Sequence, residues 1–263
     1  MLFIFKKLRR SFFLPGKVRT YLAYGIGEIA LIMIGILLAV QVSEWNDRRR
    51  EATLAQDYIL RLILDFEGEF PAFENSTDFL TMRRDFAEFL LQVAEDPKLA
   101  QERPVEFMVA VNQAGRLNTV PLNTDTIDEL RSTGNLGLLD TELKFEIFQY
   151  YRRNERLKNA WDRYNMISVE CLKLSRQVLS PEQERWIDKH VERVWPRDIP
   201  EIRAMHFDDP SLLDSVLRLQ SNTELVAWLP RVKEMHENIL RANQQLEDRL
   251  NKIIAMLKSR QEN

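Results

Sequence analysis

The feature that most constrains this chain is an apolar run from Tyr21 to Val42. The run reads YLAYGIGEIALIMIGILLAVQV, and Glu28 and Gln41 are its strongly polar members. As a helix rising 1.5 Å per residue it extends about 33 Å, which is enough to cross a hydrocarbon core of about 30 Å. A helix of a globular domain needs only one apolar stripe, so an apolar surface on every side favours a membrane span over a buried core helix.

The sequence around this run predicts a signal anchor that is not cleaved. The run is longer than the apolar region of a typical signal peptide, and Ala39-Val40-Gln41 lacks the small residue that a cleavage site needs at its last position. Six basic residues and no acidic one lie in residues 1–20, against four basic residues within 20 positions after the span. This bias predicts a cytoplasmic segment 1–20, a transmembrane helix 21–43 in the inner (cell) membrane, and a periplasmic body 44–263. A body that faces the cytoplasm is the alternative.

Glu28, Gly35 and Ala39 are the candidate contact residues within the predicted span. A carboxylate about 10 Å along a span is costly in lipid, and such residues by default mark a partner or a pathway. Gly35 and Ala39 form a small-xxx-small pair, which lets two helices approach closely. We therefore expect an oligomer of this chain or a contact with another membrane protein. A protonated Glu28 near the interface, assisted by local water, is the alternative.

The rest of the chain predicts an all-α fold, because its apolar residues recur at helical spacing and hairpin turn signals are missing. We expect the span to continue into a multi-helix bundle with long, partly coiled-coil-like helices. Gly68 and Pro71 should break the first helix, and Asp140 should cap a long one. We predict helices over residues 44–66, 76–94, 104–114, 140–179, 181–195, 210–219 and 222–258, with a loop over 196–210.

Three Ser/Thr-x-x-Glu/Gln patterns predict capping boxes at helix starts. They begin at Thr126, Ser180 and Ser221. The last predicted helix has an apolar seam whose steps alternate between three and four, as in a coiled coil. The sequence leaves open whether this seam pairs within the bundle or between two copies of the chain. The seam consists of Leu225, Trp228, Val232, Met235, Ile239, Ala242 and Leu246, continued by Leu250, Ile253 and Leu257.

The turn from Ser132 to Gly137 is a candidate binding corner. Gly134, Asn135 and Gly137 are small or turn-forming residues, and their free amides suit an anion or a peptide. A corner that only shapes the bundle explains the same residues equally well.

The signatures of common catalytic and metal sites are missing from the sequence, so we predict neither a catalytic residue nor a cofactor. The three histidines lie far apart and are expected to be solvated or at helix ends, and Cys171 lies on an apolar stripe typical of a core. The paired carboxylates, such as Glu67 and Glu69, are expected at helix caps or on solvated faces, so acid–base chemistry is not predicted for them. Residues 21–263 hold 31 basic and 40 acidic side chains, which argues against nucleic-acid binding.

Two segments of the chain resemble a family of bacterial single-pass membrane proteins. The segments are YLAYGIGEIALIMIGILLAVQVSEWND and DELRSTGNLGLLDTELKFEIFQYY. They resemble an uncharacterised family, a domain of unknown function widespread in Bacteroidota. The resemblance implies that Glu28 and the Gly-Asn-Leu corner are family features, and it implies no activity, because none is established for the family. Its features fall on Tyr24, Gly27, Glu28, Trp45, Asn46, Glu129, Leu130, Gly134, Asn135, Leu136, Tyr150 and Tyr151.

Together these features predict a membrane-anchored helical interaction or sensor/scaffold module of the bacterial envelope, and not an enzyme. Its expected partners are the lipid bilayer and a second copy or another membrane protein, and its ligand is not specified by the sequence. The alternatives are an all-α membrane-bound enzyme acting on envelope lipid or cell wall, and a scaffold facing the cytoplasm.

Overall fold

The computed structural model describes residues 17–117, 120, 122–191 and 194–261, and within them it is helical with no strand. The prediction of an all-α fold with one long apolar N-terminal helix and a helical bundle is therefore confirmed. Contacts divide the chain into two units, Met1–Asp57 and Tyr58–Asn263. Most of the predicted basic segment 1–20 lies outside the described residues.

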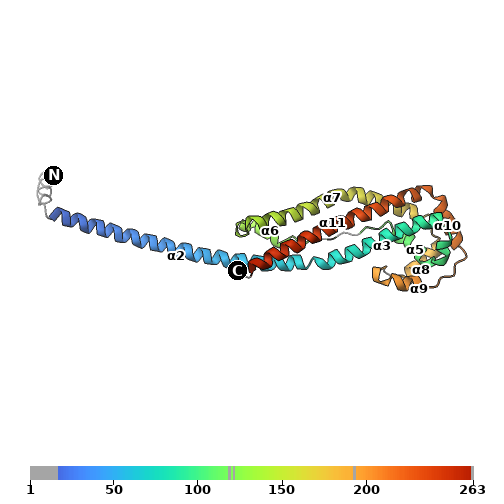
Figure 1. The fold of residues 1–263 in the computed structure, drawn as a ribbon, viewed down its shortest axis with the longest axis horizontal. Coiled ribbons are helices and arrows are strands. Elements are labelled where there is room, and N and C mark those ends of the chain that lie inside the picture. Colours follow the sequence, from blue (N-terminus) through green and yellow to red (C-terminus); the bar gives the residue numbers. More distant parts are fainter. Residues whose placement is uncertain (1–16, 118–119, 121, 192–193, 262–263) are drawn as a thin grey trace. The chain divides into compact units, whose positions relative to one another are not determined.

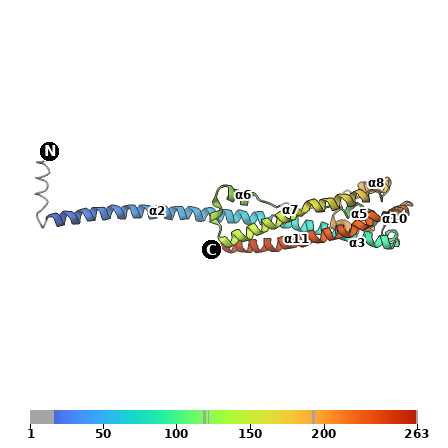
Figure 2. The same ribbon diagram turned by 90° about the horizontal axis from the view of Figure 1, so that it is seen from above.

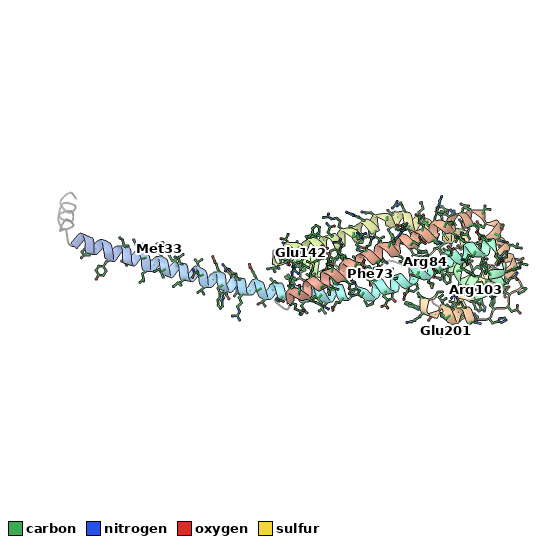
Figure 3. The ribbon with its side chains drawn as sticks, in the orientation of Figure 1. Met33, Phe73, Arg84, Arg103, Glu142 and Glu201 are labelled. Carbon is green, nitrogen blue, oxygen red and sulfur yellow. The ribbon has the colours of Figure 1, made fainter. Side chains whose placement is uncertain are left out.

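The first unit holds most of α2 (Lys17–Glu67), a single helix that contains the whole apolar run. Its large apolar side chains are exposed, as Figure 3 illustrates for Met33, which is 57% exposed. By length and composition, one helix near the N-terminus of the described chain is apolar enough to cross a membrane, and none of its most apolar stretch is buried. This exposure is compatible with a single-pass membrane protein.

The second unit is a bundle of long helices that run side by side (Figures 1 and 2). The helix α11 (Thr223–Gln261) packs on both α3 (Phe70–Glu95) and α7 (Thr141–Ser175). One end of the bundle carries α6 (Asp125–Ser132) and the 3-10 turn η1 (Asn135–Leu138). The short helices at the opposite end are α4 (Lys98–Glu102), α5 (Pro104–Gln113), α8 (Pro181–His190), α9 (Ile199–Ala204) and α10 (Leu212–Ser221).

Two apolar cores fill this bundle, one toward each end. The first joins the later part of α3 to α5, α8, α10 and the first half of α11. The second joins the end of α2 to the start of α3, the start of α7 and the second half of α11, and includes the fully buried Phe66 and Phe73. Between the two cores, the side chain of Asn243 donates a hydrogen bond to the hydroxyl of Ser76 at 3.1 Å, and both residues are buried.

The apolar seam of the last helix packs inside the bundle. Its central members Val232, Met235, Ile239 and Leu246 are buried by the chain itself, against α3 and α7. The seam therefore pairs within the bundle, because the described chain buries these side chains without a second copy.

Most of the predicted helix boundaries are confirmed. The break at Gly68 separates α2 from α3, and Pro71 stands in the first turn of α3, where its missing N–H costs nothing. Asp140 caps α7 by accepting from the N–H of Leu143 at 2.9 Å, and Ser180 forms a complete capping box with Gln183 on α8.

Three predictions about local structure are wrong. Thr126 lies inside α6, and the carboxylate of Glu129 is bound by residues of α2 instead of completing a capping box. Ser221 is the last residue of α10, and Asn222 is the residue whose side chain accepts from Leu225 N–H, at 3.0 Å. Residues 196–210 are not a loop throughout, because they contain the turn η2 (Pro196–Asp198) and α9.

Candidate functional site

The three residues singled out in the predicted span find no partner within the described chain. Glu28, Gly35 and Ala39 are all exposed on α2. A Cβ atom built at Gly35 would meet no atom within 4 Å, so another helix has room to approach there. The exposure leaves the predicted contact with a second helix as a prediction.

Replacing Glu28 by glutamine or leucine tests this contact. If Glu28 holds a partner helix by a hydrogen bond in lipid, leucine should shift the full-length protein toward the monomer, and glutamine should do so less. The measurement is the oligomeric state in a neutral detergent, with Ile29→Leu as a matched control on the same turn. An oligomeric state that stays unchanged in both variants would contradict a helix–helix contact through Glu28.

The predicted corner contains one residue in a left-handed conformation and one residue held by the bundle. Gly134 has φ of 76°, which explains glycine there, and Gly137 is exposed. Asn135 donates its amide to the hydroxyl of Tyr58 at 3.1 Å. This bond ties the corner to α2, so Asn135 has a structural task, while binding at the corner stays a prediction.

A cluster of carboxylates and tyrosines lies next to this corner. At its outer side, Arg61 and Tyr58 of α2 bind the carboxylate of Glu129, and the arginine holds the pKa of Glu129 below its usual range. At its inner side, Asp65 accepts from the side chain of Asn123 at 2.9 Å and from the N–H of Thr126 at 3.3 Å.

Glu69 is the centre of this cluster. It stands at the N-cap position of α3, one of the two kinds of place expected for it, although its side chain makes no capping hydrogen bond and is not solvated. It is only 3% exposed, and it accepts from the hydroxyl of Tyr150 and from the N–H of Asn123, the latter at 2.9 Å. Burial raises the pKa of Glu69 to about 7, against the lowering effect of these hydrogen bonds. The helix break at Gly68 places Glu69 against α7, and this tertiary contact is not visible in the local sequence.

A second site lies toward the opposite end of the bundle, in a cavity of about 390 Å³. Arg83 of α3 lines it and is only 7% exposed, and its Nε and Nη1 atoms have no hydrogen-bond partner. Burial lowers the pKa of Arg83 to about 10, and the charge of Arg116 adds to the effect, so the guanidinium is still a cation at neutral pH. The cavity is lined by Phe79, Arg83, Asn112, Gln113, Arg116, Ile187, Asp188, Val191, Val194 and Trp195.

His236 lies close enough to Arg83 to feel its charge. It is fully buried in the middle of α11, so the expectation of a solvated or helix-terminal histidine is wrong for it. Its Nε2 lies 2.8 Å from the carbonyl oxygen of Ala114, which can only accept, so the proton is on Nε2 and Nδ1 is left without a partner. Burial lowers the pKa of His236 to about 4, although the bond to Ala114 opposes this, and the charges of Arg83 and Arg84 add to the lowering.

Cys171 lies in a core as its apolar stripe predicted, and the buried carboxylate Glu146 is paired with cations. Cys171 is buried in the first core, and burial raises the pKa of its thiol to about 11. In the part of the chain that the structure describes, no group of three or more His, Cys, Asp and Glu residues is arranged to hold a metal ion. The buried carboxylate Glu146 is paired with Arg249 at 2.5 Å and with Lys252 at 2.6 Å. Arg83 differs from these residues, because it is a buried charge without an opposite charge beside it.

Comparison with protein-family models, with curated proteins and with solved structures finds no match for this chain.

Proposed function

We propose that this protein is a membrane-anchored helical interaction or sensor module of the bacterial envelope. In this proposal residues 21–43 cross the inner membrane, the N-terminus is cytoplasmic and the bundle is periplasmic. The observation that carries the proposal is the exposure of the apolar run on α2, which none of the described chain covers.

The energetics of burial support membrane attachment. The bundle buries most of its large apolar side chains in two cores, whereas those of the run from Tyr24 to Val42 stay in contact with the surroundings. An apolar surface of this extent is insoluble in water, and monomeric soluble proteins rarely expose one. In a bilayer each Leu, Ile or Val of such a helix instead gains about 0.3–0.6 kcal/mol.

The buried cluster supports an interaction or sensor role over the enzyme alternative. Its carboxylate of highest pKa, Glu69, has the proton affinity that acid–base catalysis needs near neutral pH. Both of its carboxylate oxygens, however, already accept hydrogen bonds within the chain, one from the N–H of Asn123 and one from the hydroxyl of Tyr150. The hydrogen bonds of Glu69 connect the start of α3 to Tyr150 of α7 and to Asn123 before α6, so we assign it a role in holding these elements together.

The proposed membership of the Bacteroidota family with an unknown function is supported by how the resembling residues meet. Glu129 and Asn135 both contact Tyr58 of α2, and Tyr150 contacts Glu69 at the start of α3. Residues that are far apart within the second resembling segment therefore make hydrogen bonds in the same cluster, so a single structural role accounts for several of the resembling positions.

Reporter fusions after Asn263 test the proposal. An alkaline phosphatase, active only outside the cytoplasm, is expected to be active, and a fluorescent protein that matures only inside is expected to be dark. The reverse result would place the bundle in the cytoplasm and contradict the periplasmic part of the proposal. Release of the unfused protein from membranes by alkaline carbonate, without detergent, would contradict the anchor itself.

A further inference from the structure

The unpaired guanidinium of Arg83 is the feature of the bundle that its own contacts do not explain. Buried charges in proteins are normally paired and hydrogen-bonded. The free energy of removing an unpaired ion from water is larger than the free energy gained from packing its side chain. Among the described residues Arg83 makes no ion pair and no hydrogen bond, and its one aromatic contact is with Phe79, 5.1 Å from guanidinium to ring centre. The described part of the chain therefore supplies no counter-charge for this guanidinium.

Arg83 lines the cavity, and the N–H groups on Nε and Nη1 of its guanidinium have no partner in the chain that a ligand would have to displace. The ring of Phe79 covers one face of the group, and Arg116 brings a second cation to the same cavity. Arg116 makes its hydrogen bonds to Asn112, through Nε to the backbone oxygen at 3.0 Å and through Nη2 to the side chain at 3.2 Å. Neither bond neutralises its charge, so the lining attracts an anion.

The charge balance and the apolar lining define the class of anion. Asp188 is the carboxylate among the described lining residues, so these described residues together carry two positive charges and one negative charge. This balance matches a ligand with a single negative charge better than it matches a phosphate dianion. The rings of Phe79 and Trp195 lie 5.2 Å apart in the lining, and three aliphatic side chains continue this apolar wall: Ile187, Val191 and Val194.

We propose that this cavity binds a small organic monocarboxylate, with the carboxylate on Arg83 and the apolar body between Phe79, Trp195 and the aliphatic wall. A cavity of about 390 Å³ lies at the lower end of the range for small-molecule sites, which suits a ligand with one ring. The inference deepens the sensor part of the proposed function by naming its ligand class. This inference can be tested separately from the membrane anchor, because ligand binding is measured by titration and membrane topology by reporter fusions. A failure of one test leaves the result of the other unchanged.

Calorimetric titration of the full-length protein in a neutral detergent tests the proposal, with phenylacetate as the probe. Phenylacetate has about ten heavy atoms, for which a Kd at or below about 1 mM is expected. The neutral isostere phenylacetamide should bind at least about tenfold more weakly, because it cannot neutralise Arg83. These two titrations use the unmodified protein and do not depend on whether any variant folds.

Substitutions then assign the binding to Arg83. Arg83→Gln is expected to weaken phenylacetate binding by at least about tenfold. Arg84→Gln is the matched control, since Arg84 is the next residue on α3 (labelled in Figure 3) and is already paired with Asp85. Its binding should stay within about twofold of the wild-type value, because surface ion pairs contribute little.

The stability of the ligand-free protein gives a second readout. Arg83→Met removes an unpaired buried charge and keeps an unbranched apolar side chain, so the Tm of this variant is expected to rise by about 2–4 °C. A purely structural arginine would give the opposite sign. The proposal is overturned if phenylacetate shows no saturable binding up to about 10 mM, if Arg83→Gln binds it as the wild type does, or if inorganic phosphate binds more tightly than phenylacetate.

Discussion

Replacing Tyr150 by alanine is expected to lower the free energy of unfolding by about 3–5 kcal/mol. Tyr150 is the largest fully buried side chain of the described chain, and its ring meets that of Phe66 edge-on, with the ring centres 5.7 Å apart. Alanine would leave a cavity in the second core and would also remove the hydroxyl that donates to Glu69. The buried carboxyl group would then keep only the backbone N–H of Asn123 as a donor among the described residues.

Chemical denaturation of the full-length protein in detergent, followed by circular dichroism, measures this loss. Tyr150→Phe keeps the ring and removes only the hydroxyl, so it should cost about 1–3 kcal/mol. Phe145→Ala is the matched control, because Phe145 is also an aromatic residue of α7 but is 57% exposed, and it should change stability by about 0.5 kcal/mol or less. A Tyr150→Ala protein as stable as the Phe145→Ala protein would refute the assignment of Tyr150 to the core.

Two single substitutions are expected to give the protein opposite dependences of stability on pH. In the folded protein the pKa of Glu69 is raised from 4.5 to about 7, and that of His236 is lowered from 6.5 to about 4. The contribution of Glu69 is fully present below pH 4.5 and is lost as the pH rises to about 7. The contribution of His236 is fully present above pH 6.5 and is lost as the pH falls to about 4. Each change corresponds to about 3 kcal/mol.

In the wild type the pH-dependent contributions of Glu69 and His236 to the free energy of unfolding have opposite slopes between about pH 4.5 and 6.5. A variant that lacks one of the two side chains therefore shows the pH dependence that the other produces. Relative to the wild type, Glu69→Gln should become progressively more stable as the pH rises from 4.5 to 7, and His236→Gln should become progressively more stable as the pH falls from 6.5 to 4. Measuring each variant against the wild type at every pH cancels the titration of all other groups. Differences that stay constant across this range would show that neither side chain is buried as described.

Helix boundaries were predictable from the sequence where the signal is local. Ser180 and Asp140 act within one turn of the backbone they cap, so spacing alone identifies them. The same pattern failed at Ser221, because the next residue, Asn222, is at least as good a cap and the pattern does not rank the two. It failed at Thr126 because Glu129 is used by Arg61, a contact 68 positions away in the sequence.

The buried polar residues were missed although the sequence contained a usable signal. His236 lies at helical spacing between Val232 and Ile239, and Arg83 lies in the same way between Leu80 and Leu90. A polar residue at a position of an apolar stripe has to be buried with its neighbours, whatever its own preference. The cavity beside Arg83 could not be predicted, since it joins α3, α5 and α8, whose packing the local pattern does not specify.

The hydrogen bond between Asn243 and Ser76 fixes the register of α11 against α3. A seam with apolar residues at every third and fourth position can slip by one heptad and still place apolar side chains in contact. After such a slip, His236 or Leu250 would stand opposite Ser76, and the amide of Asn243 would be buried in one of the two apolar cores without a partner. The polar pair therefore excludes misaligned pairings that the apolar seam alone would permit.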